Sequence, residues 1–257
     1  MKRTKLDVIP FGIPCEFSEL LCGADVYDSS CSPEARVLFI DRGCGYFLKT
    51  ASRGSLRKEA TLGRYFHQKG LTAPVLSYLS LDSDWLLTER VRGEDATTAC
   101  YLENPTRLAE LSGRLLRALH DMDGSDCPVQ SRMDDYFATA EKNYREGQYD
   151  LSYGNFASAD EAWQVLREGR ALLKNDTLLH GDYCLPNFLL DNWNFSGFID
   201  LGNGGVGDRH VDIFWGIWTL EFNLKTNAYR DAFVDAYGRD LVNEDILRVI
   251  SAAEVFG

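Results

Sequence analysis

Residues 178–202 read LLHGDYCLPNFLLDNWNFSGFIDLG, and this stretch decides how the rest of the chain is interpreted. Its short apolar runs are typical of strands, and polar residues interrupt them at His180, Asp182, Asn187 and Asp200. Folding alone gives little reason to gather carboxylate and amide side chains on loops beside strands, whereas binding and catalysis often do. We therefore expect these residues to hold a ligand.

Transfer of a phosphoryl group from a nucleoside triphosphate is a reaction that such residues suit. It requires positioning, metal ions that neutralise phosphate charge, and a group that accepts a hydroxyl proton. Oxygen ligands from separate segments, completed by phosphate oxygens and waters, are typical of a Mg²⁺ site, and Asn187 and Asp200 are suitable ligands. Asp182, shortly before Asn187 on the same loop, can then be the base or the orienting group.

The bulk composition excludes several classes of protein. The 257 residues suit one large domain or two small lobes, and the formal net charge is −12. This charge argues against a nucleic-acid partner, and it either attracts a cationic ligand or serves solubility alone. No apolar run is long enough for a secretory signal or a membrane span, and the seven cysteines form no C-x-x-C pair. We therefore expect a protein of the reducing cytoplasm.

The order of the expected elements predicts an α+β fold with two lobes. Strands are predicted within 35–49, around a glycine-containing turn, and at 75–80 and 84–91, with a helix at 55–69. Later helices are predicted at 105–122, 132–146, 158–173, 208–224, 228–238 and 243–255, and short strands around 177–179, 187–190 and 196–199. A small β-rich lobe, residues 1–90, would precede a larger, mostly helical lobe, residues 91–257, with ligands bound between them.

Three consecutive motifs resemble those of one enzyme family. HGDYCLPN, residues 180–187, resembles the H-G-D-x-x-x-x-N catalytic loop of the aminoglycoside phosphotransferases and their eukaryotic-like kinase relatives. FIDLG, residues 198–202, resembles their I-D-x-G segment, and the following GNGGVGDRHVDIFW matches G-x-x-G-x-x-D-x-x-x-D. CLPN together with SGFIDLG is most similar to the aminoglycoside 3′-phosphotransferases, and the resemblance implies a two-lobed, protein-kinase-like fold.

The resemblance also implies roles for the residues of these motifs. Asp182 would orient and deprotonate the accepting hydroxyl, Asn187 and Asp200 would hold magnesium, and His180 would be structural. Asp212 matches a helix aspartate that receives backbone donors from the catalytic loop. A carboxylate that only stabilises the start of its helix is the alternative for Asp212, and one side chain can do both.

In the first lobe, the resemblance implies a nucleotide site. Lys49 matches the strand lysine that contacts the α- and β-phosphates, and Glu59 matches its ion-pair partner. Main-chain groups near Thr88 and Arg90 would meet the edge of the adenine or guanine. The alternatives are that Lys49 is a plain edge-strand charge and that Glu59 belongs to a solvated helix face.

The sequence departs from the family's pattern at three places, each marked by glycine. No G-x-G-x-x-G phosphate loop is present, because Gly43 and Gly45 alone occur at the first hairpin, where they are typical of a turn. Gly181 replaces the arginine of the protein-kinase H-R-D loop, which favours the small-molecule branch. At the C-terminus, Gly257 moves the terminal carboxylate on by one residue from its place in the 3′-phosphotransferases.

A polycationic acceptor calls for carboxylates in its pocket. The second lobe offers several candidates, namely Glu141, Asp150, Asp160, Glu161, Glu221 and Glu254. By position we select Asp150, Glu221 and Glu254 for contact with the acceptor. The helically spaced aromatics Trp215, Trp218 and Phe222 are predicted to lie in the core, and Cys184 is predicted to pack the loop rather than to act as a nucleophile.

Together these expectations describe a Mg²⁺-dependent enzyme that transfers the γ-phosphate of ATP or GTP to a hydroxyl, the 3′, of an aminoglycoside and so gives antibiotic resistance. It would be a monomer or weak dimer whose partner is a small polycation, with no nucleic-acid or membrane partner. The alternatives are a kinase of choline, homoserine, a sugar or a macrolide, and a non-catalytic pseudokinase. Carboxylates beside Asp182 would favour a polyamine sugar, and an aromatic box would favour a quaternary ammonium such as choline.

Overall fold

The computed structural model describes residues 3–257 and confirms the α+β class. The chain forms two compact units, each described by itself below. The first unit contains the chain up to residue 95 together with 188–202, and the second contains 96–187 and 203–257. The segment quoted at the outset is therefore shared by the two units, and Asp200 belongs to the first while Asp182 and Asn187 belong to the second.

A six-stranded antiparallel sheet forms the body of the first unit, in the order β1-β2-β3-β4-β6-β5. Its strands are β1 (Thr4–Lys5), β2 (Asp25–Asp28), β3 (Ala35–Asp41), β4 (Tyr46–Ser52), β5 (Val75–Ser80) and β6 (Ser83–Glu89). The two predicted strand pairs are confirmed as β3–β4 and β5–β6, whereas β1 and β2 were not predicted. The turn between β3 and β4 contains Gly43 and Gly45 at φ +61° and +85°, a left-handed backbone that favours glycine.

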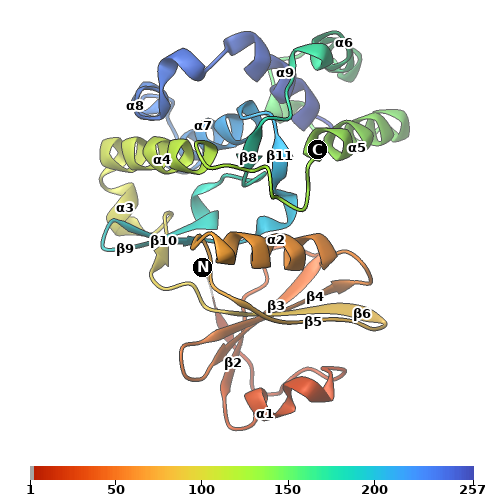
Figure 1. The fold of residues 1–257 in the computed structure, drawn as a ribbon, viewed down its shortest axis with the longest axis vertical. Coiled ribbons are helices and arrows are strands. Elements are labelled where there is room, and N and C mark those ends of the chain that lie inside the picture. The colour runs from red at the N-terminus through yellow and green to blue at the C-terminus, as the bar shows by residue number, and fades with distance from the viewer. Residues whose placement is uncertain (1–2) are drawn as a thin grey trace. The chain divides into compact units, whose positions relative to one another are not determined.

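Strand alternation places Lys49 on the face of the sheet that a helix covers. In β4, Leu48 lies opposite Leu87 of β6 and Lys49 lies opposite Leu86. Because successive side chains point to opposite faces, Leu48 and Leu87 enter the cluster that contains Leu21 of α1 (Ser18–Leu21). Leu86 instead packs with Ala60 of α2 (Arg57–Gln68), the helix that crosses the sheet in Figure 1. Lys49 therefore points toward α2.

A second, three-stranded sheet completes the first unit. Its order is β10-β9-β7, with β7 (Glu94–Asp95), β9 (Phe188–Asp191) and β10 (Asn194–Phe198). Thr72 donates a hydrogen bond to the carbonyl of Phe198 at 2.6 Å, and the amide of Phe198 donates to the carbonyl of Leu71 at 2.8 Å. These bonds fix the end of β10, and Asp200 follows it.

The second unit is mainly helical, as predicted (Figure 1). Its helices are α3 (Ala99–Leu102), α4 (Pro105–His120), α5 (Arg132–Glu146), α6 (Ala159–Gly169), α7 (His210–Leu224), α8 (Arg230–Tyr237) and α9 (Glu244–Glu254). A two-stranded antiparallel pair, β8 (Thr177–Leu179) with β11 (Gly205–Gly207), lies among them. Helices α4 and α8 approach closely at Gly113, where an added Cβ would lie 2.3 Å from the carbonyl oxygen of Phe233.

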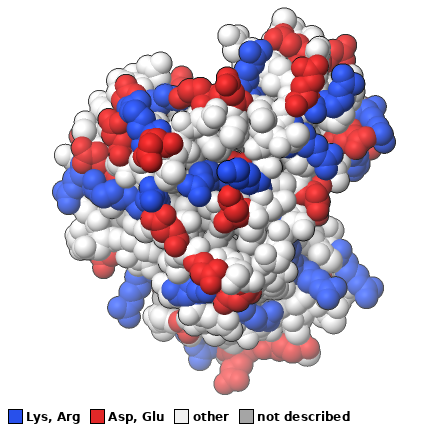
Figure 2. All heavy atoms as spheres, turned by 45° about the horizontal axis from the view of Figure 1, so that its top comes forward, with Lys and Arg blue, Asp and Glu red and all other residues white. Residues whose placement is uncertain are grey.

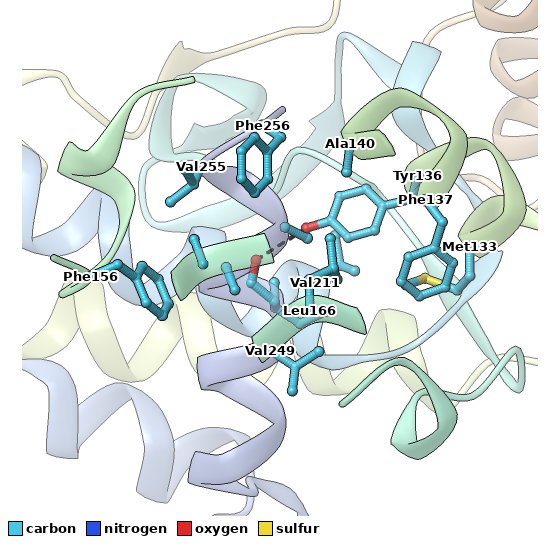
Figure 3. Packing of buried hydrophobic residues seen from close by; sticks show 14 of the residues in the cluster. Met133, Tyr136, Phe137, Ala140, Phe156, Leu166, Val211, Val249, Val255 and Phe256 are labelled. Atoms are coloured by element: carbon cyan, nitrogen blue, oxygen red, sulfur yellow. Dashed lines mark hydrogen bonds between the residues drawn. The ribbon is translucent and has the colours of Figure 1, made fainter. Parts of the chain in front are cut away.

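The core of this unit gathers apolar residues from α5, α6, α7 and α9 (Figure 3). Tyr136 of α5 points into the cluster, and its hydroxyl oxygen lies 3.5 Å from the carbonyl oxygen of Ile250 on α9. Burial of a large side chain here contributes about 1.5–3 kcal/mol to folding. The C-terminal residues Val255 and Phe256 are part of this core, so the end of the chain is anchored in it.

The surface has mixed charge. On the face shown in Figure 2, acidic and basic side chains are intermixed and neither sign forms one continuous field. Within residues 3–257 no helix is long and apolar enough to cross a membrane.

Candidate functional site

The loop that follows β8 is held by a buried carboxylate on α7. Asp212, in the first turn of that helix, accepts hydrogen bonds from the backbone amides of His180 and Gly181, each at 2.7 Å. The Nε2 atom of His120 lies 3.2 Å from the same carboxylate, and His120 Nδ1 lies 2.8 Å from the hydroxyl of Tyr237. Burial lowers the pKa of His120, and the charge of Asp212 only partly opposes this.

Only glycine fits at position 181. Its φ is +85°, and an added Cβ would lie 1.8 Å from the carbonyl oxygen of Asn203. A clash with backbone cannot be relieved by a side-chain movement. The glycine that replaces the arginine of protein kinases is therefore required by the path of this loop.

Within the loop, Asp182 and Asn187 are in direct contact. The Nδ2 atom of Asn187 donates to the side-chain Oδ2 of Asp182 at 2.8 Å and to its carbonyl oxygen at 3.0 Å. The amide of Asp182 donates to His180 Nδ1 at 3.3 Å, and the side chain of His180 is buried. The proposed base and one proposed metal ligand thus lie on one short, well-bonded turn.

Two further contacts anchor this loop to the helices beneath it. The hydroxyl of Tyr183 donates to the carbonyl of Ser112 on α4 at 2.8 Å. The amide of Leu185 donates to the hydroxyl of Thr219 on α7 at 3.1 Å. Cys184 is buried, and burial followed by the charge of Asp182 raises the pKa of its thiol, so the thiol stays protonated. This supports the packing role expected for Cys184.

In the first unit, Lys49 bridges two carboxylates. Its ammonium lies 2.8 Å from Glu59 Oε2 and 3.0 Å from Asp200 Oδ1. Burial alone would lower the pKa of Lys49, but the charges of Glu59 and Asp200 outweigh burial and raise it. Burial raises the pKa of Glu59, and Lys49 opposes that shift. Lys49 is therefore a firmly charged cation, and Glu59 is a buried partner rather than part of a solvated face.

Asp200 combines exposure with an uncommon backbone. Its side chain is 53 % exposed, and its φ is +58°, which is left-handed and rare for a residue with a side chain. Such conformations cluster at functional sites, where the surrounding structure maintains them.

Asn187, in the second unit, and Asp200, in the first, each carry an oxygen donor suited to Mg²⁺. An amide oxygen and a carboxylate are the hard oxygen donors that Mg²⁺ prefers, and it completes its shell with water and phosphate oxygens. Within residues 3–257 no group of three His, Cys, Asp or Glu residues is arranged to hold a metal by itself.

A cavity of about 180 Å³ lies in the first unit beside its second sheet. Phe47, Val91, Leu189 and Ile199 line it with apolar side chains, and Arg3, Arg90, Glu94 and Asp95 line it with charged ones, whereas Thr88 does not line it. Apolar walls with a few polar groups are typical of a small-molecule site. The amide of Arg90 already donates to the carbonyl of Gly45 at 2.9 Å, so contact with a purine edge would use other groups.

The expected acceptor carboxylates have different surroundings. Glu254 is 6 % exposed, and its Oε1 accepts from the hydroxyl of Tyr136 at 2.6 Å and from Trp215 Nε1 at 3.0 Å. Burial raises the pKa of Glu254 to about 7. Asp150 is exposed and accepts from the amide of Ser152 at 2.8 Å.

Tyr153 lies within electrostatic reach both of these carboxylates and of Asp182 in the catalytic loop. Burial raises its pKa, and the charges of Asp150 and Glu254 add to the effect. The charge of Asp182 acts in the same direction, so Tyr153 lies within electrostatic reach of all three. Sequence reasoning missed Tyr153, because a lone tyrosine in a loop carries no periodic signal.

The remaining candidate acids serve other roles or none. Glu221 is exposed on α7, and no side-chain hydrogen bond to another described residue holds it. Glu141 pairs with Arg145 on the same helix, Asp160 accepts from the hydroxyl of Tyr144, and Glu161 accepts from the amide of Ala157.

The prediction that the α7 aromatics lie in the core is wrong for Phe222, which is 54 % exposed, and holds only in part for Trp215 and Trp218, which are half-buried. Helical spacing shows that residues share a face, but it does not show what covers that face.

Comparison with known proteins yields consistent similarities. A family described as "Phosphotransferase enzyme family" matches residues 32–249. A "Probable aminoglycoside 3'-phosphotransferase" of Lactococcus lactis is 46 % identical over 261 residues, which cover 100 % of this chain and 99 % of that protein.

Solved structures resemble the fold. The crystal structure of an aminoglycoside-3'-phosphotransferase of type VIII matches with a TM-score of 0.75 at 24 % identity, covering 95 % of this chain and 100 % of that one. The aminoglycoside phosphotransferase APH(3'')-Id from Streptomyces rimosus, in complex with ADP and streptomycin, matches with a TM-score of 0.70 at 20 % identity, covering 86 % and 90 %.

Proposed function

Since the chain belongs to the phosphotransferase enzyme family, and is thus a small-molecule O-phosphotransferase, we propose that it transfers the γ-phosphate of ATP or GTP to the 3′ hydroxyl of an aminoglycoside. The single observation that carries this proposal is the loop after β8, where Asp182 is bonded to Asn187 and the backbone is clamped by Asp212. A carboxylate in this setting suits a base for a hydroxyl proton.

The first unit supplies the groups for a nucleotide. Lys49, held by Glu59, would contact the α- and β-phosphates, and the cavity that Phe47 and Arg90 line would take the base. Asn187 and Asp200 would hold magnesium, which when bound neutralises charge on the triphosphate. The complex of the S. rimosus enzyme with ADP supports a nucleotide as the phosphate donor.

The acceptor would be recognised by negative charge. Asp150 and Glu254 surround Tyr153 within electrostatic reach of Asp182, and carboxylates bind ammonium groups through charge-assisted hydrogen bonds. The name of the L. lactis relative supports an aminoglycoside and its 3′ position. We extend the proposal to antibiotic resistance, to a cytoplasmic monomer or weak dimer, and to a functional division of the chain at residue 90.

A kinase of a small quaternary ammonium such as choline is the second candidate. The observation that favours it is the group of aromatic rings, Tyr153, Trp215 and Trp218, near the catalytic loop. A non-catalytic pseudokinase is disfavoured, because Lys49, Asp182 and Asn187 are all present and bonded.

The proposed function is tested by turnover with purified protein, Mg²⁺ and either ATP or GTP. Kanamycin should stimulate nucleotide consumption, and ³¹P NMR of the product should show a phosphomonoester at the 3′ oxygen. The matched control is a 3′-deoxy analogue, which should give no product. Stimulation by choline but by no aminoglycoside would replace the proposal with the second candidate.

A further inference from the structure

An aromatic surface borders the catalytic loop in the second unit. It consists of Tyr153, from the short 3-10 helix Leu151–Tyr153, with Trp215 and Trp218 of α7, and we refer to these three residues as the aromatic platform. The ring of Tyr153 lies 5.7 Å from each of the two indoles, and the indoles lie 5.3 Å apart. All three side chains are partly exposed, so ring surface remains available to a ligand.

The platform is adjacent to the proposed base because α7 packs directly on the catalytic loop. Thr219 accepts the hydrogen bond from the amide of Leu185, and a Cβ at Gly216 would lie 3.4 Å from the ring of Tyr183. Trp215 immediately precedes Gly216, and Trp218 immediately precedes Thr219. The two indoles therefore lie beside the face of α7 that supports the loop.

The platform is fixed before any ligand binds. Trp215 Nε1 donates to Glu254 at 3.0 Å, and Tyr136 donates to the same oxygen at 2.6 Å, which ties the indole to the core. Trp218 stacks on Phe222 with ring centroids 4.8 Å apart and planes 11° apart. The platform side chains are therefore already ordered, and a ligand that binds them would cost little further side-chain entropy.

The chemistry of this surface has two parts. The faces of the rings attract C–H groups and cations, and the charges of Asp150, Glu254 and Asp182 all reach Tyr153. Neutral sugars could donate hydroxyl hydrogen bonds to the carboxylates but would gain no attraction between opposite charges. A ring with C–H groups on its face and ammonium groups on its edge satisfies both parts, and an aminated sugar or cyclitol has this form.

We propose that the acceptor's aminated ring stacks on Tyr153 and Trp218, so that the aromatic platform, and not carboxylates alone, selects the acceptor and presents its hydroxyl to Asp182. The proposal rests on the proposed function, whose acceptor it specifies. Tyr153 and Trp218 are thus specificity-determining residues, and because stacking uses the face of the ring, the proposal does not call on the hydroxyl of Tyr153.

The test compares Tyr153→Ala and Trp218→Ala with Tyr153→Phe and with Tyr149→Ala as the matched control. Tyr149 is a neighbouring tyrosine that is 54 % exposed and lies outside the platform. We expect each platform alanine variant to weaken kanamycin binding by about tenfold, which corresponds to one cation–π contact of about 1.4 kcal/mol. The KM for nucleotide should stay within about twofold in these variants, because the nucleotide does not touch the platform. Tyr153→Phe, which keeps the ring, and Tyr149→Ala should bind kanamycin with an affinity within about twofold of that of the wild type.

A second readout needs neither turnover nor a variant. Kanamycin that stacks on the platform should quench the tryptophan fluorescence of the wild-type protein, with a midpoint that matches the calorimetric Kd.

The variants of the first test are compared only when their thermal melting matches that of the wild type.

The outcomes separate this inference from the proposed function. Phosphorylation of kanamycin with unchanged affinity in both alanine variants would overturn the platform and leave the function intact. Quenching and platform-dependent binding without phosphorylation would support the platform and overturn the function. Failure of the wild type to bind any aminoglycoside would overturn both.

Discussion

Replacement of Asp212 by asparagine should destabilise the protein far more than loss of a helix-end charge would. Asp212 is fully buried, and its two oxygens accept the backbone amides of His180 and Gly181 at 2.7 Å. Asparagine keeps one acceptor but places an amide NH₂ against the second backbone N–H. One charge-assisted bond is lost and one buried donor is left unsatisfied.

The magnitude follows from these two bonds. A hydrogen bond to a charged group contributes about 1.5–3 kcal/mol, and an unsatisfied buried donor costs about 1–3 kcal/mol, with some overlap between the two. We expect Asp212→Asn to lower the free energy of unfolding by about 2–4 kcal/mol. If Asp212 only complemented the helix dipole, the loss would be about 0.3–1 kcal/mol.

Urea denaturation followed by tryptophan fluorescence measures this difference. The matched control is Asp245→Asn, since Asp245 is an exposed carboxylate in the first turn of α9, and it should lose less than about 1 kcal/mol. Because the chain has two units, the transition of each must be resolved before a free energy is assigned. Equal losses of unfolding free energy in Asp212→Asn and Asp245→Asn would refute the claim that Asp212 holds the loop through its two backbone hydrogen bonds.

Three further predictions concern separate parts of the site. Gly181→Ala should lower the free energy of unfolding, measured by thermal melting, by at least about 2 kcal/mol, because the added Cβ would clash with backbone atoms. Its control is Gly147→Ala, where φ is a similar +69° but the space around the Cβ is open, and it should lose only about 1 kcal/mol. The pKa of Glu254 is raised from 4.5 to about 7, so the folded protein keeps the proton on this carboxyl to a higher pH than the unfolded chain does. The free energy of unfolding should therefore fall by about 3 kcal/mol as the pH rises from 4.5 to 7. Urea titrations at several pH values measure this slope, and Glu254→Gln should remove it. Lys49→Met should raise the KM for nucleotide by at least about tenfold in steady-state assays, and an unchanged KM would contradict its phosphate role.

Much of the fold could be predicted because the relevant signals are local. Alternating residues in 35–49 and 75–91 specified two hairpins, and helical periodicity specified α4 to α9. Strands β1 and β2 were missed because they are short, with two and four residues, and are stabilised by pairing with neighbouring strands more than by their own sequence.

In the candidate site, too, local signals could be predicted from the sequence, whereas contacts between distant segments could not. The order of polar residues indicated Asp182, Asn187 and Asp200 in advance, because fixed spacing on one loop is visible in the sequence. The surroundings of Glu254 and the position of Tyr153 depend on contacts between distant segments, such as the hydrogen bond between Tyr136 and Glu254. Periodicity alone could not show that Trp218 stacks on Phe222 while Phe222 remains exposed.

The central claim is that Asp182 accepts the proton of the acceptor's hydroxyl during phosphoryl transfer. The rate of transfer to kanamycin in a single turnover, compared between wild type and Asp182→Asn, tests it most directly. We expect a loss of about 10²–10⁴-fold with nucleotide binding retained, which is the usual contribution of a positioned base. A rate equal to that of the wild type would contradict the claim.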